Sequence, residues 1–126
     1  MEKLEIDFVN NPYYYCTRLV AMCTGYTLDE LLLIHDVKGG WRAKDFIQLI
    51  HGAGFNCDHR FKKFNPATEH PCLLRSKIFN DPSHWAVCVY YDGCCYVPGV
   101  GIYFSIEDYQ DANRHLKITS MLQVWI

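Results

Sequence analysis

The sequence lacks any apolar run of the roughly 18 residues that a membrane-spanning helix needs. Its first residues, from Met1 to Glu5, lack the basic segment followed by an apolar segment that marks a secretory signal. A basic surplus is also missing, because 12 Lys and Arg stand against 14 Asp and Glu, and the formal net charge is −2. Proteins that bind a phosphate backbone normally carry such a surplus. We therefore expect a cytoplasmic protein that binds neither a membrane nor nucleic acid.

Cysteines are numerous, but the spacing that would give them a structural role is missing. There are 7 of them, an odd number, whereas a secreted disulfide scaffold normally carries an even set. No C-x-x-C pair occurs, and the scattered histidines and cysteines lack the paired spacing of a zinc site. We expect mostly reduced thiols, no metal and no cofactor, with Cys23, Cys72 and Cys88 acting as small apolar side chains in apolar runs.

The length and composition indicate one folded domain over residues 1–126. Half of the 126 residues are hydrophobic and 15% are aromatic, which excludes a disordered chain. A chain of this length can bury one sizeable core. No internal repeat, linker or low-complexity tract divides it. The small size favours a stand-alone protein of a phage or a bacterium.

The first half of the sequence has the pattern of helices. Residues 16–24 are compact and apolar and stop at Gly25, a plausible C-cap. Thr27 and Glu30 form a capping box that opens a helix to about residue 35, and a third amphipathic helix spans about 42–51 after a break at Gly39 and Gly40. The alternation over residues 3–9 is compatible with a short N-terminal strand.

After Gly54 the period changes to two, which is typical of strands. Asp92 and Gly93 form a strong signal for a two-residue hairpin turn, and Ser105 opens a short helix. Helices followed by an antiparallel sheet of four to six strands give the α+β class, not a doubly wound fold. The expected strands are residues 55–61, 71–79, 84–91, 94–97, 101–104 and 116–126.

Two residues stand where a helix-then-sheet protein can carry out nucleophilic chemistry. Cys16 lies at the start of the first helix, where the partial positive charge of the helix N-terminus lowers a thiol pKa. His84 lies at the start of a central strand, from which an imidazole can take the thiol proton. The alternative is structural: Cys16 is then a buried helix cysteine like Cys23, and His84 is a strand-end histidine with a satisfied hydrogen bond.

At these positions the sequence resembles the C39-like papain-fold cysteine peptidases, the relatives of the bacteriocin-processing enzymes that cleave double-glycine leaders. The resemblance spans about residues 10–104 and rests on stretches in the right order: residues 16–26, then 27–32 with 39–46, and then 84–90 followed by 92–93. It implies a papain-like fold, with N-terminal helices packed on a C-terminal antiparallel sheet, and a peptide or protein substrate. It also implies that Cys16 and His84 are catalytic, with Asn10 or Asn11 in place of the oxyanion-hole glutamine.

The sequence departs from this family at two points. An alignment without a gap on Ala21, Met22, Gly25 and Tyr26 places Tyr15, not Cys16, at the position of the nucleophile. The family's third member, an Asp or Asn before a proline, is replaced by Val97 before Pro98. Asp81 can replace it only if its loop folds back toward His84.

Two functions therefore remain open. The first is a cysteine peptidase-like hydrolase in which Cys16 attacks a peptide or isopeptide bond and His84 acts as base and then as acid. The second is a pseudo-peptidase that keeps the fold as a peptide- or protein-binding module. For the first we predict that Cys16 is the most reactive thiol and lies within about 4 Å of His84. We also predict that Val97 lies beside the imidazole.

Overall fold

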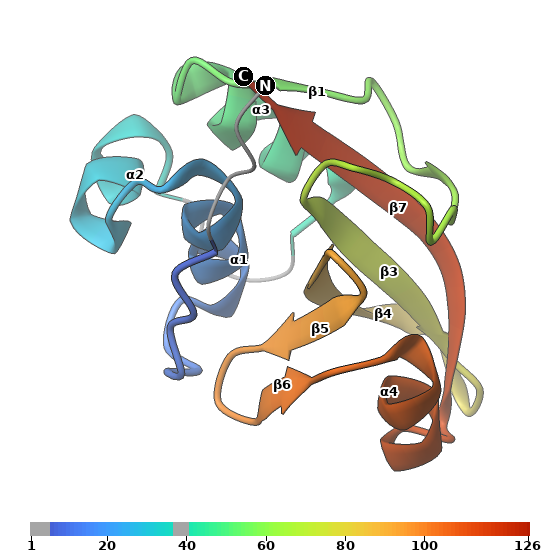
Figure 1. The fold of residues 1–126 in the computed structure, drawn as a ribbon. Helices are drawn as coiled ribbons and strands as arrows, with labels where there is room; N and C mark the ends of the chain where they lie inside the picture. Colours follow the sequence, from blue (N-terminus) through green and yellow to red (C-terminus); the bar gives the residue numbers. More distant parts are fainter. Residues whose placement is uncertain (1–5, 37–40) are drawn as a thin grey trace.

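Figure 1 shows the computed structural model of the chain, which describes residues 6–36 and 41–126. The helices of these residues are α1 (Tyr15–Thr24), α2 (Leu28–Ile34), α3 (Ala43–Gly52) and α4 (Ile106–Ala112). The strands are β1 (Asn56–Cys57), β2 (Lys62–Lys63), β3 (Cys72–Ile78), β4 (Asp81–Tyr91), β5 (Cys94–Val97), β6 (Gly101–Tyr103) and β7 (Leu116–Trp125). Three helices precede the sheet, which confirms the α+β class.

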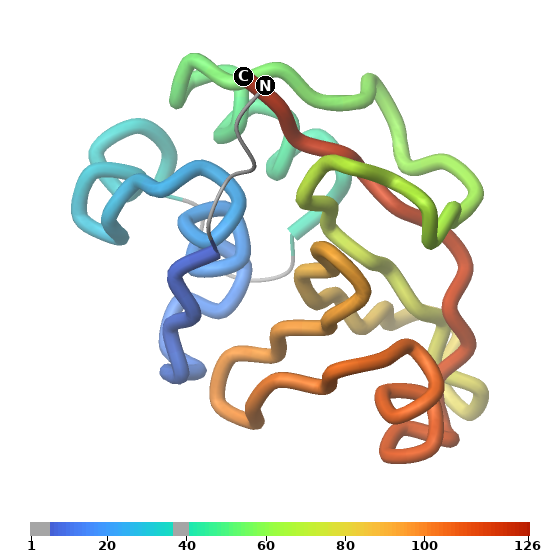
Figure 2. Tube along the Cα trace, viewed as in Figure 1, coloured from blue at the N-terminus to red at the C-terminus, as the bar shows by residue number. Residues whose placement is uncertain are grey.

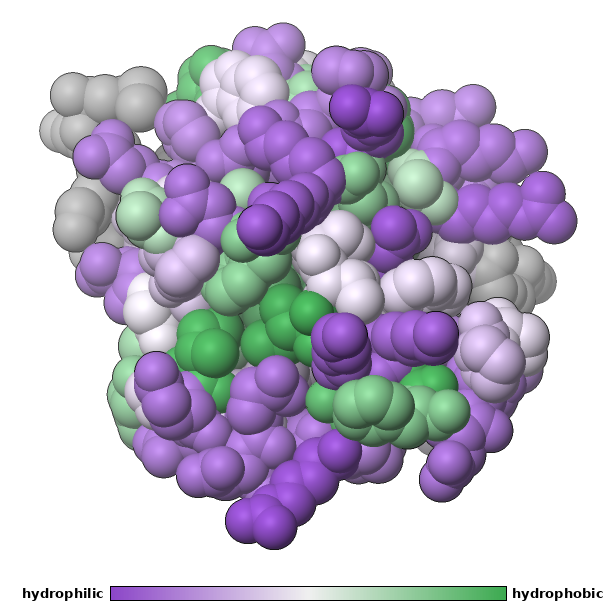
Figure 3. Space-filling view, turned by 90° about the vertical axis from the view of Figure 1, so that its right-hand side faces the viewer, coloured by the Kyte–Doolittle hydropathy of each residue, from purple (hydrophilic) through white to green (hydrophobic). Residues whose placement is uncertain are grey.

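The strands form one antiparallel sheet in the order β1-β7-β3-β4-β5-β6, and β2 also pairs with β7. Figure 2 follows the chain from the helices at its blue end to β7 at its red end, which runs beside β3. The side of the molecule that carries β7 is mostly hydrophilic, with a smaller group of apolar side chains within it (Figure 3). Figure 1 shows that the first three helices lie together at one side of the sheet.

The prediction of four to six strands was too low, because the expected strand at residues 55–61 is divided in two. Its ends pair with β7 as β1 and β2. Between them, Asp58 turns its carboxylate toward β7, where Oδ2 accepts a hydrogen bond from the Gln123 backbone N–H at 2.8 Å. A side-chain oxygen thus takes the place of a strand carbonyl, and the ladder is interrupted there.

The turns and caps confirm most of the expected boundaries. At the β4–β5 turn, Asp92 and Gly93 both have positive φ, 49° and 84°, as a tight two-residue hairpin requires. The Thr27 hydroxyl accepts from the Glu30 N–H while the Glu30 carboxylate accepts from the Thr27 N–H, so the predicted capping box is present. Residues 6–9 form no strand, however, and the rest of the expected N-terminal strand lies outside the described residues, as do Gly39 and Gly40.

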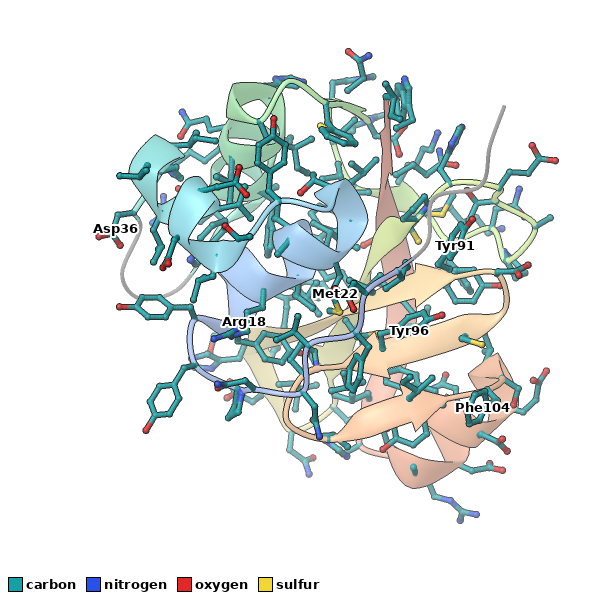
Figure 4. All side chains as sticks on the ribbon, turned by 60° about the vertical axis from the view of Figure 1, so that its left-hand side comes forward. Arg18, Met22, Asp36, Tyr91, Tyr96 and Phe104 are labelled. Carbon is teal, nitrogen blue, oxygen red and sulfur yellow. The ribbon has the colours of Figure 1, made fainter. Side chains whose placement is uncertain are left out.

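Two apolar clusters cover the two faces of the sheet. On one face, α1 and α3 pack against buried residues of the central strands, and Met22 lies where α1 meets the sheet (Figure 4). On the other face, Tyr109 from α4 packs against Leu74, Cys88 and Met121. All 7 cysteines are free thiols, and Cys23, Cys72 and Cys88 are buried as expected. Each fully buried Leu or Val stabilises the fold by roughly 1.5–3 kcal/mol relative to an exposed one.

Within the described residues, none of the helices has the length and apolar character needed to cross a membrane.

Candidate functional site

Cys16 is the second residue of α1, so the structure places it at the N-terminus of the first helix as the sequence predicts. The N-cap residue is Tyr14, which has a left-handed conformation with φ 53° and ψ 47°. No side chain caps this end, and the first turn contains no acidic residue. The free N–H groups of the first turn carry partial positive charge, which favours an anion nearby.

The helix N-terminus favours the thiolate form of Cys16, but the other surroundings of the thiol raise its pKa. Burial is the larger cause, and the negative charge of Asp45 on α3 is the second; together they raise the pKa of Cys16 to about 11. At that value about one thiol in 10⁴ is ionised at neutral pH. In this arrangement little of Cys16 is in the thiolate form at neutral pH.

Tyr15, the first residue of α1, is hydrogen-bonded to β4. Its hydroxyl donates to the backbone carbonyl of Val87 at 2.5 Å, and burial raises its pKa well above the ordinary range. Consecutive residues of an α-helix project about 100° apart. The position that an alignment without a gap assigns to the nucleophile is thus occupied by a tyrosine bonded to the sheet.

His84 lies in an irregular part of β4. Lys77 of β3 pairs with Trp85, but the next residue, Ile78, pairs with Asp81, so residues 82–84 lie outside the ladder. A β-bulge of this kind redirects side chains. The imidazole of His84 is largely exposed, with 72% of the side chain accessible.

The bulge brings Asp81 back to His84. The Nδ1 atom of His84 lies 2.7 Å from Asp81 Oδ2, and the hydroxyl of Ser83 donates to Asp81 Oδ1 at 2.8 Å. The hydrogen bond from Ser83 is the main cause that lowers the pKa of Asp81, and the contact with His84 lowers it further. Asp81 therefore stands as an ionised carboxylate that can orient the imidazole and fix its tautomer.

The structure joins His84 to Asp81 but does not join either of them to Cys16. Within the described residues, no hydrogen bond connects the Cys16 sulfur with a ring nitrogen of His84. The pKa of the Cys16 thiol is raised by burial and by the charge of Asp45, and an imidazole is not among these causes. The predicted nucleophile and the predicted base thus belong to two separate groups of side chains in this conformation.

The candidate oxyanion residues precede α1. Asn11 Oδ1 accepts a hydrogen bond from the Tyr13 backbone N–H at 2.9 Å, which is an Asx turn. Asn10 is exposed and makes no hydrogen bond within the described part of the chain. The side chain of Asn11 thus helps to shape the entry to α1, and among the described residues no hydrogen bond links either amide to Cys16.

Val97 lies away from His84, which differs from the prediction. The β4–β5 ladder ends at the pair of Val89 and Tyr96, and Val97 packs into the cluster on the α4 face. Val89 is five residues beyond His84 along β4, and His84 lies in the bulge at the other end of the strand. The two-residue turn sets the hairpin register, so β5 pairs with the end of β4 that is farther from His84.

Sequence reasoning missed Asp45, the charged residue that affects the candidate nucleophile. Its Oδ2 accepts from the Arg42 backbone N–H at 2.8 Å, so it caps α3. Its Oδ1 lies 3.7 Å from Nε2 of His35, at the end of α2. The spacing of Arg42 and Asp45 indicates a cap, but only the packing of α3 against α1 brings this carboxylate near Cys16.

Two further groups were not predicted. Cys57 Sγ lies 3.7 Å from His51 Nε2, and burial and the charge of Asp58 raise the pKa of this thiol to about 11. The guanidinium of Arg75, on β3, lies over the rings of Phe61 and Trp85. Within residues 6–36 and 41–126, no group of three or more His, Cys, Asp or Glu side chains is arranged to hold a metal ion.

Comparison of the chain with protein-family models, curated proteins and solved structures found no match.

Proposed function

We propose that this chain is a peptide-binding module with a papain-like fold of the C39-like kind, in which the Cys16–His84 pair turns over substrate slowly or not at all. The observation that carries this proposal is the state of Cys16. Within the described residues, its sulfur makes no hydrogen bond to a ring nitrogen of His84, and burial, followed by the charge of Asp45, raises its pKa to about 11. A thiol nucleophile depends on its thiolate form, which is scarce here.

Exposed aromatic side chains near the two candidate elements support binding. Tyr13 and Tyr14 precede α1 with 76% and 50% of their surfaces exposed. Trp85, next to His84 on β4, is 45% exposed. Tyrosine and tryptophan are enriched where proteins bind one another, because they bring large rigid surfaces at low entropic cost. A cytoplasmic location suits this proposal, because that compartment keeps thiols such as these 7 reduced.

Turnover assays test this proposal. We expect the wild-type chain and Cys16→Ala to be equally inactive on a peptide library, a p-nitrophenyl ester and an anilide. Both chains should bind the same members of the library, because binding does not use the sulfur. Hydrolysis that disappears in Cys16→Ala would overturn the proposal.

The second candidate is a cysteine peptidase-like hydrolase, and the pair of Asp81 and His84 favours it. An imidazole held by a carboxylate at 2.7 Å has the support that a general base needs. In this mechanism the Cys16 sulfur attacks a carbonyl carbon and His84 takes the thiol proton. His84 then returns the proton to the leaving amine, and water releases the acyl group.

The pH dependence of Cys16 alkylation separates the two candidates. An ion pair with His84 would give a labelling rate that is already substantial near pH 6 and that falls in His84→Ala. The proposed binding module gives a rate that rises steadily toward pH 11 and is unchanged in His84→Ala. Asp81→Ala is the matched second variant, because it removes the partner of the imidazole and leaves the imidazole in place.

A further inference from the structure

Arg75 lies where the helix-covered core on β3 ends. Leu73 is completely buried against the helices, while Lys77, two residues after Arg75 on the same face, is exposed. Arg75 pairs with Val87 of β4 on one side and with Ser120 of β7 on the other. It is half-buried at the border between the core and the open part of this face.

The guanidinium of Arg75 is held in a fixed position. Its Cζ atom lies 4.3 Å from the centre of the Phe61 ring and 4.6 Å from that of Trp85. Its Nε atom donates to the Ser120 hydroxyl at 3.0 Å. Phe61 in turn contacts the buried ring of Phe46, with centroids 6.4 Å apart, so the stack is anchored to the core. The entropy of ordering this arginine is thus already lost in the free protein.

The charge of this arginine is not balanced by the protein. Within the described residues, no carboxylate lies within ion-pair distance of Arg75, and neither Nη atom has a hydrogen-bond partner. Lys77 and Lys117 are directly opposite each other on β3 and β7, and neither has an ion-pair partner among these residues. Like charges facing each other across a sheet destabilise it. Burial also lowers the pKa of Arg75, as expected for a cation that has lost water without gaining an anion.

This arginine lies next to the elements of the candidate site. Val87, its partner on β4, accepts the hydrogen bond from Tyr15 of α1. Trp85, which stacks on the guanidinium, directly follows His84. A peptide that lies between the N-terminus of α1 and the start of β4 therefore passes beside Arg75.

We propose that Arg75 is a subsite for the carboxylate of an acidic residue in a bound peptide. The two Nη groups can donate to both oxygens of one carboxylate, which is the strongest and most directional pairing available to arginine. Phe61 and Trp85 hold the guanidinium in place, and the charges of Lys77 and Lys117 add attraction for an anion. This inference rests on the proposed peptide-binding function and adds to it the chemical class of the ligand.

Titration of the ¹⁵N-labelled full chain with two peptides tests the subsite. The probes are acetyl-Ala-Glu-Ala-Ala-amide and the same peptide with Gln in place of Glu. We expect the Glu peptide to shift the Arg75 Nε–H and Trp85 indole signals and to bind at least tenfold more tightly than the Gln peptide. Equal binding of the two peptides would overturn the proposal, as would the absence of shifts up to about 10 mM peptide.

The variants separate a fork-shaped site from a general positive charge. Arg75→Gln should abolish the preference for Glu, and Arg75→Lys should keep only a small part of it. Arg114→Gln, which removes the same charge from an exposed arginine, should leave the preference intact. If Arg75→Gln fails to fold, Arg75→Lys and the wild-type titration still decide the question.

Two outcomes separate this inference from neighbouring ones. Stronger shifts with inorganic phosphate than with the Glu peptide would identify a phosphate site and overturn the carboxylate assignment. Cys16-dependent cleavage of a library peptide would overturn the proposed function, but a preference for Glu over Gln would leave the Arg75 subsite standing.

Discussion

The substitution Asp45→Asn should make Cys16 more reactive, and its effect can be bounded from the structure. The pKa of Cys16 rises from an ordinary 9.0 to about 11, and burial is the larger of the two causes. Asp45 therefore accounts for less than half of that rise, or at most roughly one pH unit. Asparagine keeps an oxygen that can accept from Arg42, so α3 should keep its cap.

A lower pKa changes alkylation in two opposing ways. The thiolate fraction near pH 8 increases up to about tenfold, while the nucleophilicity of each thiolate falls with a Brønsted slope of about 0.4–0.5. The net result is a rate of Cys16 labelling by iodoacetamide that rises up to about threefold. Peptide mapping gives this rate relative to Cys94, a partly exposed thiol in the same chain.

Asp36→Asn is the matched control, because it removes the same charge from an exposed position two residues after α2. We expect no change in Cys16 labelling in this control. An unchanged rate in Asp45→Asn, or an equal increase in Asp36→Asn, would refute the reasoning that a specific charge on α3 suppresses the thiol.

Three further predictions concern the surroundings of the site and the fold. Tyr15→Phe removes the hydrogen bond to Val87 and should lower the free energy of unfolding by about 1 kcal/mol in urea titrations, while Tyr13→Phe at an exposed position should change it little. Ser83→Ala should raise the pKa of Asp81 toward 3.8, as measured by carboxyl NMR titration. Because the folded pKa lies below that value, the stabilisation is present above pH 4 and is lost as the pH falls through the folded pKa. Gly93→Ala should destabilise the hairpin by roughly 1–2 kcal/mol through its φ of 84° alone, because the added methyl group meets no atom within 4 Å. Thermal unfolding measures this loss, and an unaltered unfolding midpoint would contradict the argument.

Local sequence signals predicted most elements of the fold. The Asp92-Gly93 turn fixed the β4–β5 register, and the Thr27–Glu30 box placed the start of α2. These signals act over a few residues and do not depend on the rest of the chain. The alternation at residues 55–61 failed because Asp58 bonds to a strand 65 residues away, which no local pattern reports.

The candidate site could be predicted less well, because it depends on rotation and register. A shift of one residue along α1 separates Cys16 from Tyr15, and it is the Tyr15 hydroxyl that bonds to the Val87 carbonyl of β4. Asp81 was predicted to reach His84 only if its loop folded back. The bulge at residues 82–84 makes that turn, since Ile78 pairs with Asp81 directly after the pair of Lys77 and Trp85.

The place of β7 in the sheet has a consequence for how the chain folds. This strand is the last element in the sequence, yet it lies between β1 and β3 and supplies the completely buried Leu122 and Val124. During synthesis, the helices and the β3–β4–β5 hairpins can emerge while the edge of β3 is still unpaired. An unpaired edge invites association with other chains until its partner arrives. A chain cut before Leu116 should therefore aggregate, and folding should be completed only after the last strand has left the ribosome.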